Sequence, residues 1–402
     1  MSNSLSLEKT KLFVLLALIF FGAALSFTFL PLLLIPLRED LSISNSLAGL
    51  LYTVLLVGSG LARFLGGGLA SRFGKIALIR SACLLMALGA GFLALAPSYG
   101  LALPAALLLG IGNGLYVPNS FSLVSDLFPE KRGRMIGLYD SIFPFSALGA
   151  FGMERLSSFT GDWRYGMGSL ALYMIVLLTA LLFYRLWGRP ALLPEQIFSG
   201  RREDASFSIR GEAKRVLDAV KNSPSFLRIF LLVIPVGVFS FGFLHSLPSF
   251  LVEARGLSQA GAGLVYFIYM GLNIPGKNLA GHLIESRGAK VPLLLSFGLA
   301  IAGTLLVVSL PQLLPLFLGL FLIAPARGGI FTIMHTHLLG NLPEDTVDLL
   351  YGFFMVMVTI TGAIGPALMG LIIDLGGFIP GLLFLAGVLI SGLPLTLRIG
   401  KS

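Results

Sequence analysis

Residues 66–75 read GGGLASRFGK, a short stretch with three glycines, two cations and a fourth glycine between them. It interrupts a chain that is otherwise strongly apolar, and it has a counterpart at 281–290, which reads GHLIESRGAK. Glycine permits a tight turn where two helix ends approach closely, and the cations favour a layer next to water. We therefore expect each stretch to be a turn between two apolar helices.

The composition predicts that these helices cross a membrane. Of the 402 residues, 56% are hydrophobic and 12% are charged, and the mean hydropathy is +0.92. A soluble protein of this length could not cover its surface with so few charges. Uncharged runs of about 20 residues are long enough to cross a hydrocarbon core of about 30 Å.

The positions of the uncharged runs predict twelve spans. Two of the runs are long enough to cross twice, with turns at Pro97 and Pro311, and a further span lies in 134–156, which contains Asp140 and Glu154. The remaining spans follow from the other runs. The uncharged runs are 12–37, 41–62, 81–125, 165–184, 229–252, 256–276, 291–326, 349–373 and 375–397.

The basic residues are distributed unevenly between the two sides. With twelve spans, 21 of the 28 Lys and Arg residues fall on the side of both termini. Cytoplasmic loops carry such an excess, so both termini are expected in the cytoplasm and the net charge of +9 orients the chain in a membrane. We expect no nucleic-acid partner. The single cysteine, Cys83, excludes an internal disulfide.

The sequence repeats itself at a constant offset of 214 residues. No gap is needed over more than a hundred residues, and such a repeat implies two six-helix halves in parallel orientation. The matches include Ala48, Gly49, Leu50 and Tyr52 with Ala262, Gly263, Leu264 and Tyr266, and Pro129-Glu130 with Pro343-Glu344.

The longest polar stretch, 188–225, separates the two halves. We expect an N-terminal half over 1–187, a cytoplasmic linker over 188–225 and a C-terminal half over 226–402. Apolar residues within GEAKRVLDAV (211–220) are spaced for one face of a helix, which predicts a short interfacial helix in the linker.

With these features in view, the chain resembles the major facilitator superfamily of secondary transporters. The family's signature, Gly-x-Leu-Ala-Asp-Arg-x-Gly-Arg, is matched by Gly67, Leu69, Ala70, Arg72 and Gly74, with Lys75 in place of the last arginine. The family's acid is Ser71 here, whereas the repeat partner of Ser71 is Glu285. The resemblance covers essentially the whole chain, and it implies an all-α membrane fold of twelve helices in two pseudosymmetric halves.

In the family, this stretch acts as a latch between the halves on the cytoplasmic side. The resemblance therefore implies a latch role for several residues here, with Asp126 as the expected partner of Arg72. The expected latch residues are Gly67, Arg72, Gly74, Lys75, Asp126, Gly281, Glu285 and Arg287.

Ionisable groups inside the predicted spans are candidates for a substrate site, because each costs at least about 2.5–3.5 kcal/mol on insertion scales. Arg63 and Lys277 are repeat mates, and Arg327 is the repeat mate of Asn113. Guanidinium and ammonium groups on pseudosymmetric helices would hold an anion. The expected substrate-binding residues are Arg63, Lys277, Arg327, Asn113, Tyr116 and His245. For each of the cations, the alternative is a structural role: a snorkelling side chain for Arg63 and a buried structural contact for Arg327.

Asp140 and Lys277 form a second expected site. Both lie about 9–12 Å into the membrane from the cytoplasmic side, in spans five and eight, which pack together in the family that this chain resembles. Opposite charges at matching depth would pair, and protonation of Asp140 or arrival of an anion at Lys277 would release the pair.

The expected function is secondary active transport of a small solute, an organic or other small anion, by alternating access. The alternatives are a proton-driven exporter of lipophilic or amphiphilic compounds and a transporter-like receptor. No catalytic motif is present, so we expect no enzyme, no cofactor and no metal. The expected partners are the solute, a coupling ion such as a proton, and the lipids of the plasma membrane, with the chain acting as a monomer.

Overall fold

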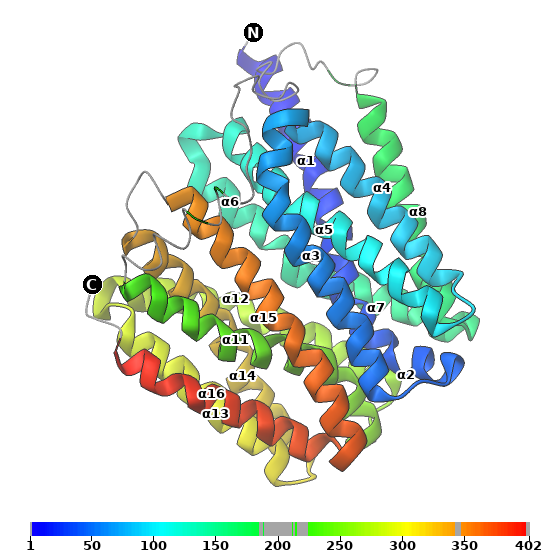
Figure 1. The fold of residues 1–402 in the computed structure, drawn as a ribbon, viewed down its shortest axis with the longest axis vertical. Helices are drawn as coiled ribbons and strands as arrows, with labels where there is room; N and C mark the ends of the chain where they lie inside the picture. The colour runs from blue at the N-terminus through cyan, green and yellow to red at the C-terminus, as the bar shows by residue number, and fades with distance from the viewer. Residues whose placement is uncertain are drawn as a thin grey trace. The chain divides into compact units, whose positions relative to one another are not determined.

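The computed structural model describes residues 2–184, 188, 211, 214, 224–341 and 347–398, and within these ranges all regular structure is helical. The helices form two compact units (Figure 1). The first unit comprises Met1–Leu41 and Val54–Phe207, and the second comprises Ser42–Thr53 and Ser208–Ser402. The linker helix expected at 211–220 lies outside the described residues, except for Gly211 and Lys214. The expected domain boundaries at 187 and 226 stay a prediction.

The first half of the chain contains eight α-helices and one 3₁₀ turn in its described residues. They are α1 (Ser2–Thr28), α2 (Leu30–Leu41), α3 (Asn45–Phe73), α4 (Lys75–Ala94), α5 (Tyr99–Leu127), η1 (Pro129–Lys131), α6 (Arg132–Asp140), α7 (Ile142–Thr160) and α8 (Trp163–Leu182).

The second half contains six α-helices and one π-helical turn in its described residues. They are α11 (Pro224–Ser249), η4 (Phe250–Ala254), α12 (Gln259–Arg287), α13 (Lys290–Ser309), α14 (Leu313–Asn341), α15 (Val347–Gly376) and α16 (Phe378–Leu397).

Ten helical stretches in the described part of the chain are long and apolar enough to cross a membrane. They include every expected span except 134–156 and 256–276. The latter is α12, a continuous helix of 29 residues that carries Lys277 among other polar side chains. The turns expected at Pro97 and Pro311 are confirmed, because α4 ends at Ala94 before α5 starts, and α13 ends at Ser309 before α14 starts.

The span expected over 134–156 consists of two helices, α6 and α7, with a break at Ser141. Pro144 lacks an amide hydrogen, so the carbonyl of Asp140, four residues earlier, cannot receive the usual helical bond. The same reason applies to the break between α1 and α2, where Pro31 follows Phe29. In both places a proline explains why one crossing is built from two helices.

The opening stretch GGGLASRFGK is mostly helical, which corrects the expectation of a loop. Residues 66–73 continue α3, and the turn to α4 is made by Gly74 alone, whose φ is 85°. Its repeat mate Gly288 ends α12 with a φ of 68°. Only glycine adopts this left-handed backbone readily, so the sharp turn between two long helices requires it at both positions.

The start of α3 is held against α15 within the second unit. The carboxylate of Asp374, in the last turns of α15, accepts bonds from the backbone nitrogens of Asn45 (3.0 Å) and Ser46 (2.8 Å) and from both of their side chains. It therefore satisfies amide groups that a helix N-terminus leaves unpaired. One turn beyond, the hydroxyl of Thr53 donates to the carbonyl of Ala363 at 2.6 Å. These bonds fix the position of Tyr52.

The repeat is visible in the packing of each unit. A Cβ on Gly114 of α5 would lie 2.2 Å from the carbonyl oxygen of Ser59 in α3, and one on Gly328 of α14 would lie 2.4 Å from that of Asn273 in α12. The two pairs are related by the offset of 214 residues. In each unit, glycine is therefore required where two helix backbones touch.

We predict that Gly328→Ala destabilises the protein, because the added methyl must push α14 away from α12. Overpacking of this kind costs about 1–3 kcal/mol. Thermal unfolding of the purified protein in detergent measures the effect. Gly271→Ala is the matched control, since a Cβ on Gly271 of α12 meets nothing within 4 Å. Equal melting temperatures for the two variants would contradict the close contact.

Candidate functional site

The expected latch residues of the first unit lie at the junction of α3 and α4. Asp126, at the end of α5, forms an ion pair with Lys75, the first residue of α4. The expected partner was Arg72, but its guanidinium lies over the ring of Phe73 instead, at 5.3 Å. The reason is the single-residue turn at Gly74, after which α4 begins with Lys75 beside α5, whereas Arg72 remains on the last turn of α3.

The corresponding residues of the second unit occupy the last turns of α12. Glu285 and Arg287 are exposed, Gly281 is half-buried, and Gly288 makes the turn. Ser71, which stands where the family has an acid, donates its hydroxyl to the carbonyl of Gly68 at 2.8 Å. The latch role of both stretches stays a prediction.

The two repeat-related cations, Arg63 and Lys277, are half-buried side chains of α3 and α12. Asp140 is half-buried at the last residue of α6, just before the break at Ser141. Arg63 and Asp140 belong to the first unit and Lys277 to the second, so the binding of one anion by both cations and the pairing of Asp140 with Lys277 stay predictions.

Asn113 and Tyr116, on α5, are buried and hydrogen-bonded inside the first unit. The amide nitrogen of Asn113 donates to the carbonyl of Ala23 at 2.8 Å, and its oxygen accepts from the hydroxyl of Ser59 at 3.3 Å. The hydroxyl of Tyr116 donates to the carbonyl of Leu16 at 2.6 Å and lies 2.8 Å from that of Tyr139. These bonds join α1, α3, α5 and α6 within the bundle, and the expected contact with substrate stays a prediction.

Arg327 has a different environment in the second unit. Its side chain is buried on α14 with 8% of its surface exposed, and Nη1 donates to Oδ1 of Asn273 on α12 at 3.1 Å. The side-chain pair Arg327–Asn273 is the repeat mate of Asn113–Ser59, since each member is displaced by 214 residues. The bond is thus present in both units, and a positive charge replaces a neutral amide in the second.

Aromatic and polar side chains surround this guanidinium. Three of them, Tyr266, Tyr269 and Asn273, share one face of α12, because their spacing of three and four residues places them on successive turns. The charge of Arg327 lies close enough to act on the hydroxyls of Tyr52, Tyr266 and Tyr269. The group, which we name the arginine cluster, consists of Tyr52, His245, Tyr266, Tyr269, Asn273 and Arg327.

The arginine cluster is closed by rings from three other helices. The rings of Tyr52 and His245 are 5.1 Å apart, and Phe243 of α11 lies 5.6 Å from Tyr269. Phe331, one turn beyond Arg327, lies 5.9 Å from its guanidinium carbon. All six members of the cluster are buried. The guanidinium therefore sits among low-dielectric aromatic walls, where an uncompensated charge is costly.

Three polar atoms of the arginine cluster have no hydrogen-bond partner among the described residues. They are Nε of Arg327 and the hydroxyl oxygens of Tyr266 and Tyr269. No carboxylate within the described ranges lies at ion-pair distance from Arg327. Buried polar groups are almost always satisfied, so a group of three unpaired atoms around one charge marks a binding site more than a structural core.

Sequence reasoning identified Arg327 and His245 but not the tyrosines or Asn273. A signal was available for Tyr52 and Tyr266, which are repeat mates and supported the repeat itself. Their relation to Arg327 was hidden, because α3, α12 and α14 are far apart in the sequence. Among the described residues, no group of His, Cys, Asp or Glu could hold a metal ion.

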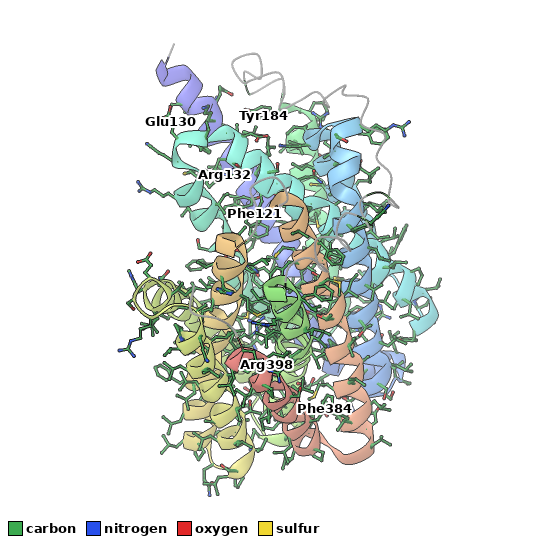
Figure 2. All side chains as sticks on the ribbon, turned by 60° about the vertical axis from the view of Figure 1, so that its left-hand side comes forward. Phe121, Glu130, Arg132, Tyr184, Phe384 and Arg398 are labelled. Atoms are coloured by element: carbon green, nitrogen blue, oxygen red, sulfur yellow. The ribbon has the colours of Figure 1, made fainter. Side chains whose placement is uncertain are left out.

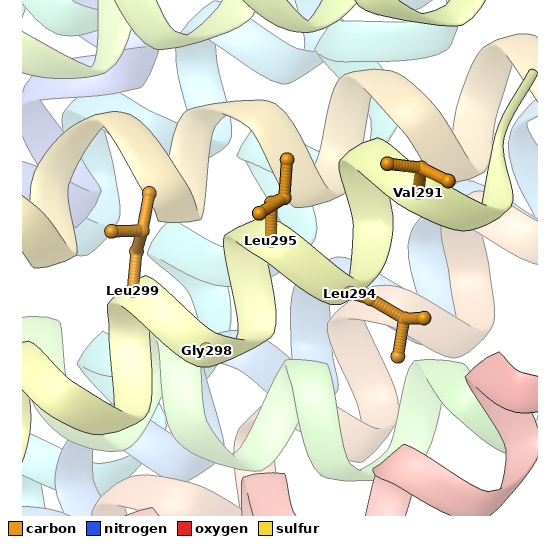
Figure 3. A pocket seen from close by; sticks show the side chains of 5 residues that line it. All are labelled: Val291, Leu294, Leu295, Gly298 and Leu299. Carbon is orange, nitrogen blue, oxygen red and sulfur yellow. The ribbon is translucent and has the colours of Figure 1, made fainter. Parts of the chain in front are cut away.

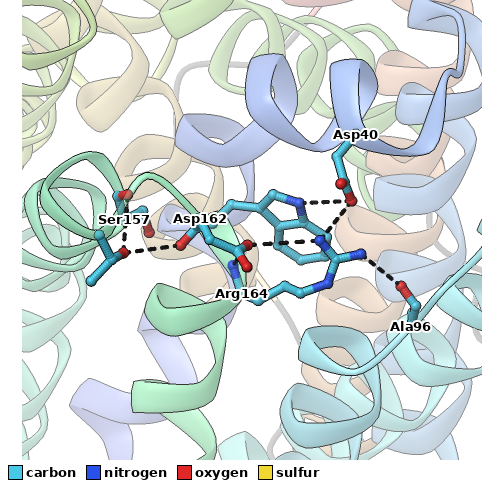
Figure 4. Close-up of polar contacts among 7 residues, drawn as sticks. Asp40, Ala96, Ser157, Asp162 and Arg164 are labelled. Carbon is cyan, nitrogen blue, oxygen red and sulfur yellow. Dashed lines mark hydrogen bonds and ion pairs between the residues drawn. The ribbon is translucent and has the colours of Figure 1, made fainter.

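A second polar network, at the start of α8, has its groups satisfied. The guanidinium of Arg164 lies 2.8 Å from the carboxylate of Asp40 and donates to the carbonyl of Ala96 at 3.2 Å, while the indole of Trp163 donates to Asp40 at 3.2 Å (Figure 4). Asp162 caps α8 by accepting from the backbone nitrogen of Arg164 at 2.9 Å. This network ties α2 and the turn before α5 to α8, and its role is structural.

The expected cytoplasmic groups of the first unit lie together. Glu130, Arg132 and Tyr184 are found toward the end of the unit where α1 begins (Figure 2). Tyr184 donates to the carboxylate of Glu8 at 3.2 Å, and burial together with this carboxylate raises the pKa of the Tyr184 hydroxyl. Charged groups at one end of a membrane bundle are typical of an interface with water.

A shallow groove on α13 has the opposite character. Every residue that lines it is apolar (Figure 3), so it offers no polar group to a solute and is typical of a surface in contact with lipid acyl chains. The lining residues are Val291, Leu294, Leu295, Gly298 and Leu299.

Helical bundles that repeat one unit within a chain, span a membrane and bury an unpaired cation define a class of secondary transporters. The chain belongs to the Major Facilitator Superfamily, whose family model matches residues 13–328. The expected family and the all-α fold of twelve spans are therefore confirmed. The chain is a multi-pass membrane protein and a transporter rather than an enzyme.

Individual relatives are distant. The hexuronate transporter of Bacillus subtilis (strain 168) is 25% identical over 369 residues, which cover 87% of this chain and 85% of that protein. The galactose-proton symporter of Escherichia coli (strain K12) is 25% identical over 198 residues, which cover 46% of this chain and only 41% of the symporter. A solved structure of a mutant of the nucleoside transporter NupG has a TM-score of 0.81 and 14% identity, covering 99% of this chain and 100% of that chain. The last likeness concerns the fold alone.

We predict that Arg327→Met raises the melting temperature of the ligand-free protein. Methionine has a similar length and removes a buried charge, and Asn273 keeps two backbone bonds through Nδ2, at 2.8 and 3.2 Å. A gain of about 1 kcal/mol or more corresponds to a rise of a few degrees. The control is Arg164→Met, which removes a paired guanidinium and should leave the melting temperature unchanged or lower it. A lower melting temperature for Arg327→Met would identify Arg327 as a structural residue.

Proposed function

We propose that this protein transports a small organic anion across the cell membrane, and that Arg327 binds the anionic group. The observation that carries the proposal is the buried guanidinium with Nε unpaired and no carboxylate partner among the described residues. A carboxylate of the substrate would complete the ion pair that the chain itself does not supply there.

The energetic argument favours an anion over a neutral or cationic solute. A guanidinium inside a membrane span costs at least about 2.5–3.5 kcal/mol on insertion scales, and one bond to Asn273 compensates only part of that cost. Arginine presents several N–H donors in a planar fork that matches a carboxylate, and Nη1 alone is used by the chain. A lipophilic cation would be repelled by the same group.

The relatives support both the solute class and the coupling. The name of the Bacillus subtilis relative specifies a hexuronate, which is an anion, and the name of the Escherichia coli relative specifies proton coupling. We infer that this protein carries its anion by alternating access, coupled to protons, as a monomer in the plasma membrane. In this scheme Arg63, Lys277 and His245 contribute to the same site, and Asp140 with Lys277 forms a gate that opens when either charge is neutralised.

We predict that acids bind and that their neutral analogues do not. The probes are pairs that differ only in charge, such as galacturonate with galactose, benzoate with benzamide, and cyclohexanecarboxylate with its amide. At least one acid should raise the melting temperature of the purified protein, and the same acid should be taken up by proteoliposomes under an inward proton gradient. Arg327→Gln should abolish both effects, and Arg327→Lys should retain part of them.

The control is Arg164→Gln, in the polar network at the start of α8, which should retain binding and uptake. Binding of neutral analogues as tight as that of the acids, or full uptake by the Arg327→Gln variant, would contradict the proposal. A panel in which no acid binds would count against it as well.

We also predict that residues 188–225 face the cytoplasm, because the side with both termini carries most of the cations. Ala205→Cys in a Cys83→Ala background gives a single thiol for labelling. An impermeant maleimide should label it in inverted vesicles and leave it unlabelled in intact cells. Labelling from outside intact cells would reverse the orientation.

A further inference from the structure

Two unpaired hydroxyls lie beside the guanidinium of Arg327 in the arginine cluster. Tyr266 and Tyr269 are almost completely buried, with 0% and 1% of their surface exposed, and neither hydroxyl has a hydrogen-bond partner among the described residues. Other buried tyrosines of this chain are bonded: Tyr116 and Tyr139 share the carbonyl of Leu16. Leaving a buried hydroxyl unpaired costs about as much as a hydrogen bond contributes, so two of them together need an explanation.

The hydroxyls are grouped around the charge that the substrate would neutralise. Both lie within reach of the Arg327 charge, and Tyr266 also lies near Tyr52 and Tyr269. Tyr266, Tyr269 and Asn273 share one face of α12, and Asn273 holds the guanidinium at 3.1 Å. A molecule whose carboxylate binds Arg327 would therefore lie along this face, with the phenolic groups beside its body.

The amide of Asn273 is already in use. Its Nδ2 donates to the carbonyls of Tyr269 and Met270, and its Oδ1 accepts from Arg327. The unpaired groups that remain for a ligand are the two hydroxyls and Nε of Arg327. A phenolic hydroxyl donates one bond and accepts another, so it matches an alcohol oxygen of a ligand well.

We propose that the substrate is a hydroxylated carboxylate: an acid whose body carries alcohol groups that bond to Tyr266 and Tyr269. This inference rests on the proposed function, because it assigns the carboxylate to Arg327, and it adds that the tyrosines determine specificity. A site built to bond hydroxyl groups rejects an analogue that lacks them, because its own polar atoms then stay buried and unpaired. An acid with a purely apolar body fills the same space without satisfying either tyrosine.

The test compares two acids that share a six-membered ring and a carboxylate. Galacturonate carries hydroxyls on its ring, and cyclohexanecarboxylate carries none. Titration calorimetry on the full-length protein in detergent measures their Kd values. Galacturonate should bind the wild-type protein at least about tenfold more tightly, since the loss of one hydrogen bond can change an affinity by about this factor.

Phenylalanine variants locate the effect. Tyr266→Phe and Tyr269→Phe should each weaken galacturonate binding by up to about tenfold and leave cyclohexanecarboxylate binding unchanged or tighter. Each variant removes one oxygen atom that has no partner, so the ligand-free melting temperature should stay equal or rise. Tyr165→Phe is the matched control, because Tyr165 is 60% exposed on α8 of the first unit and should change neither Kd.

The outcomes separate this inference from the proposed function. If both acids bind equally and both depend on Arg327, the anion site stands and the inference on hydroxyl groups is wrong. The same conclusion follows if the phenylalanine variants lose both acids to the same extent. If galacturonate binding survives Arg327→Gln, the proposed anion site is wrong. A Kd for galacturonate that rises in the tyrosine variants alone supports the inference.

Discussion

The close contact between two helix backbones at a glycine is the constraint on which each unit depends. Gly114 lies against the carbonyl of Ser59, and Gly328 lies against that of Asn273. A side chain at either glycine would separate the helices, and every contact next to it would be lost. The residue before each glycine therefore points at the same neighbouring helix, and this places Asn113 and Arg327 at equivalent positions in the two units.

The two units use this common geometry in different ways. In the first, the amide of Asn113 is saturated by Ala23, Ser26 and Ser59, which makes it a structural bond between helices. In the second, Arg327 brings a charge and more donors than the chain can satisfy. A repeat that keeps its backbone contact while one copy changes the side chain can retain the packing and add a binding group. This difference is the physical basis for assigning the solute-binding residue to the second unit.

The sequence was informative where the physics is local. Run lengths and prolines predicted the crossings, and Pro97 and Pro311 do separate helices. It was wrong about GGGLASRFGK, of which only Gly74 leaves the helix. It also assigned Asp126 to Arg72, whereas Lys75 forms the pair. Both errors have one cause, because the length of a turn fixes which side chain faces the next helix, and composition does not reveal that length.

By itself, the sequence determined the class of fold, the twelve crossings, the repeat and the family, because hydrophobic run length and a constant offset are properties of one dimension. Only the tertiary structure decided which buried polar groups are satisfied. Arg327 meets Asn273 across 54 residues of sequence, and the start of α3 is bonded to Asp374 across more than 300. Hydrogen bonding depends on distances of a few ångströms between such remote segments, so the arginine cluster and its unpaired hydroxyls could be found only after the helices were packed.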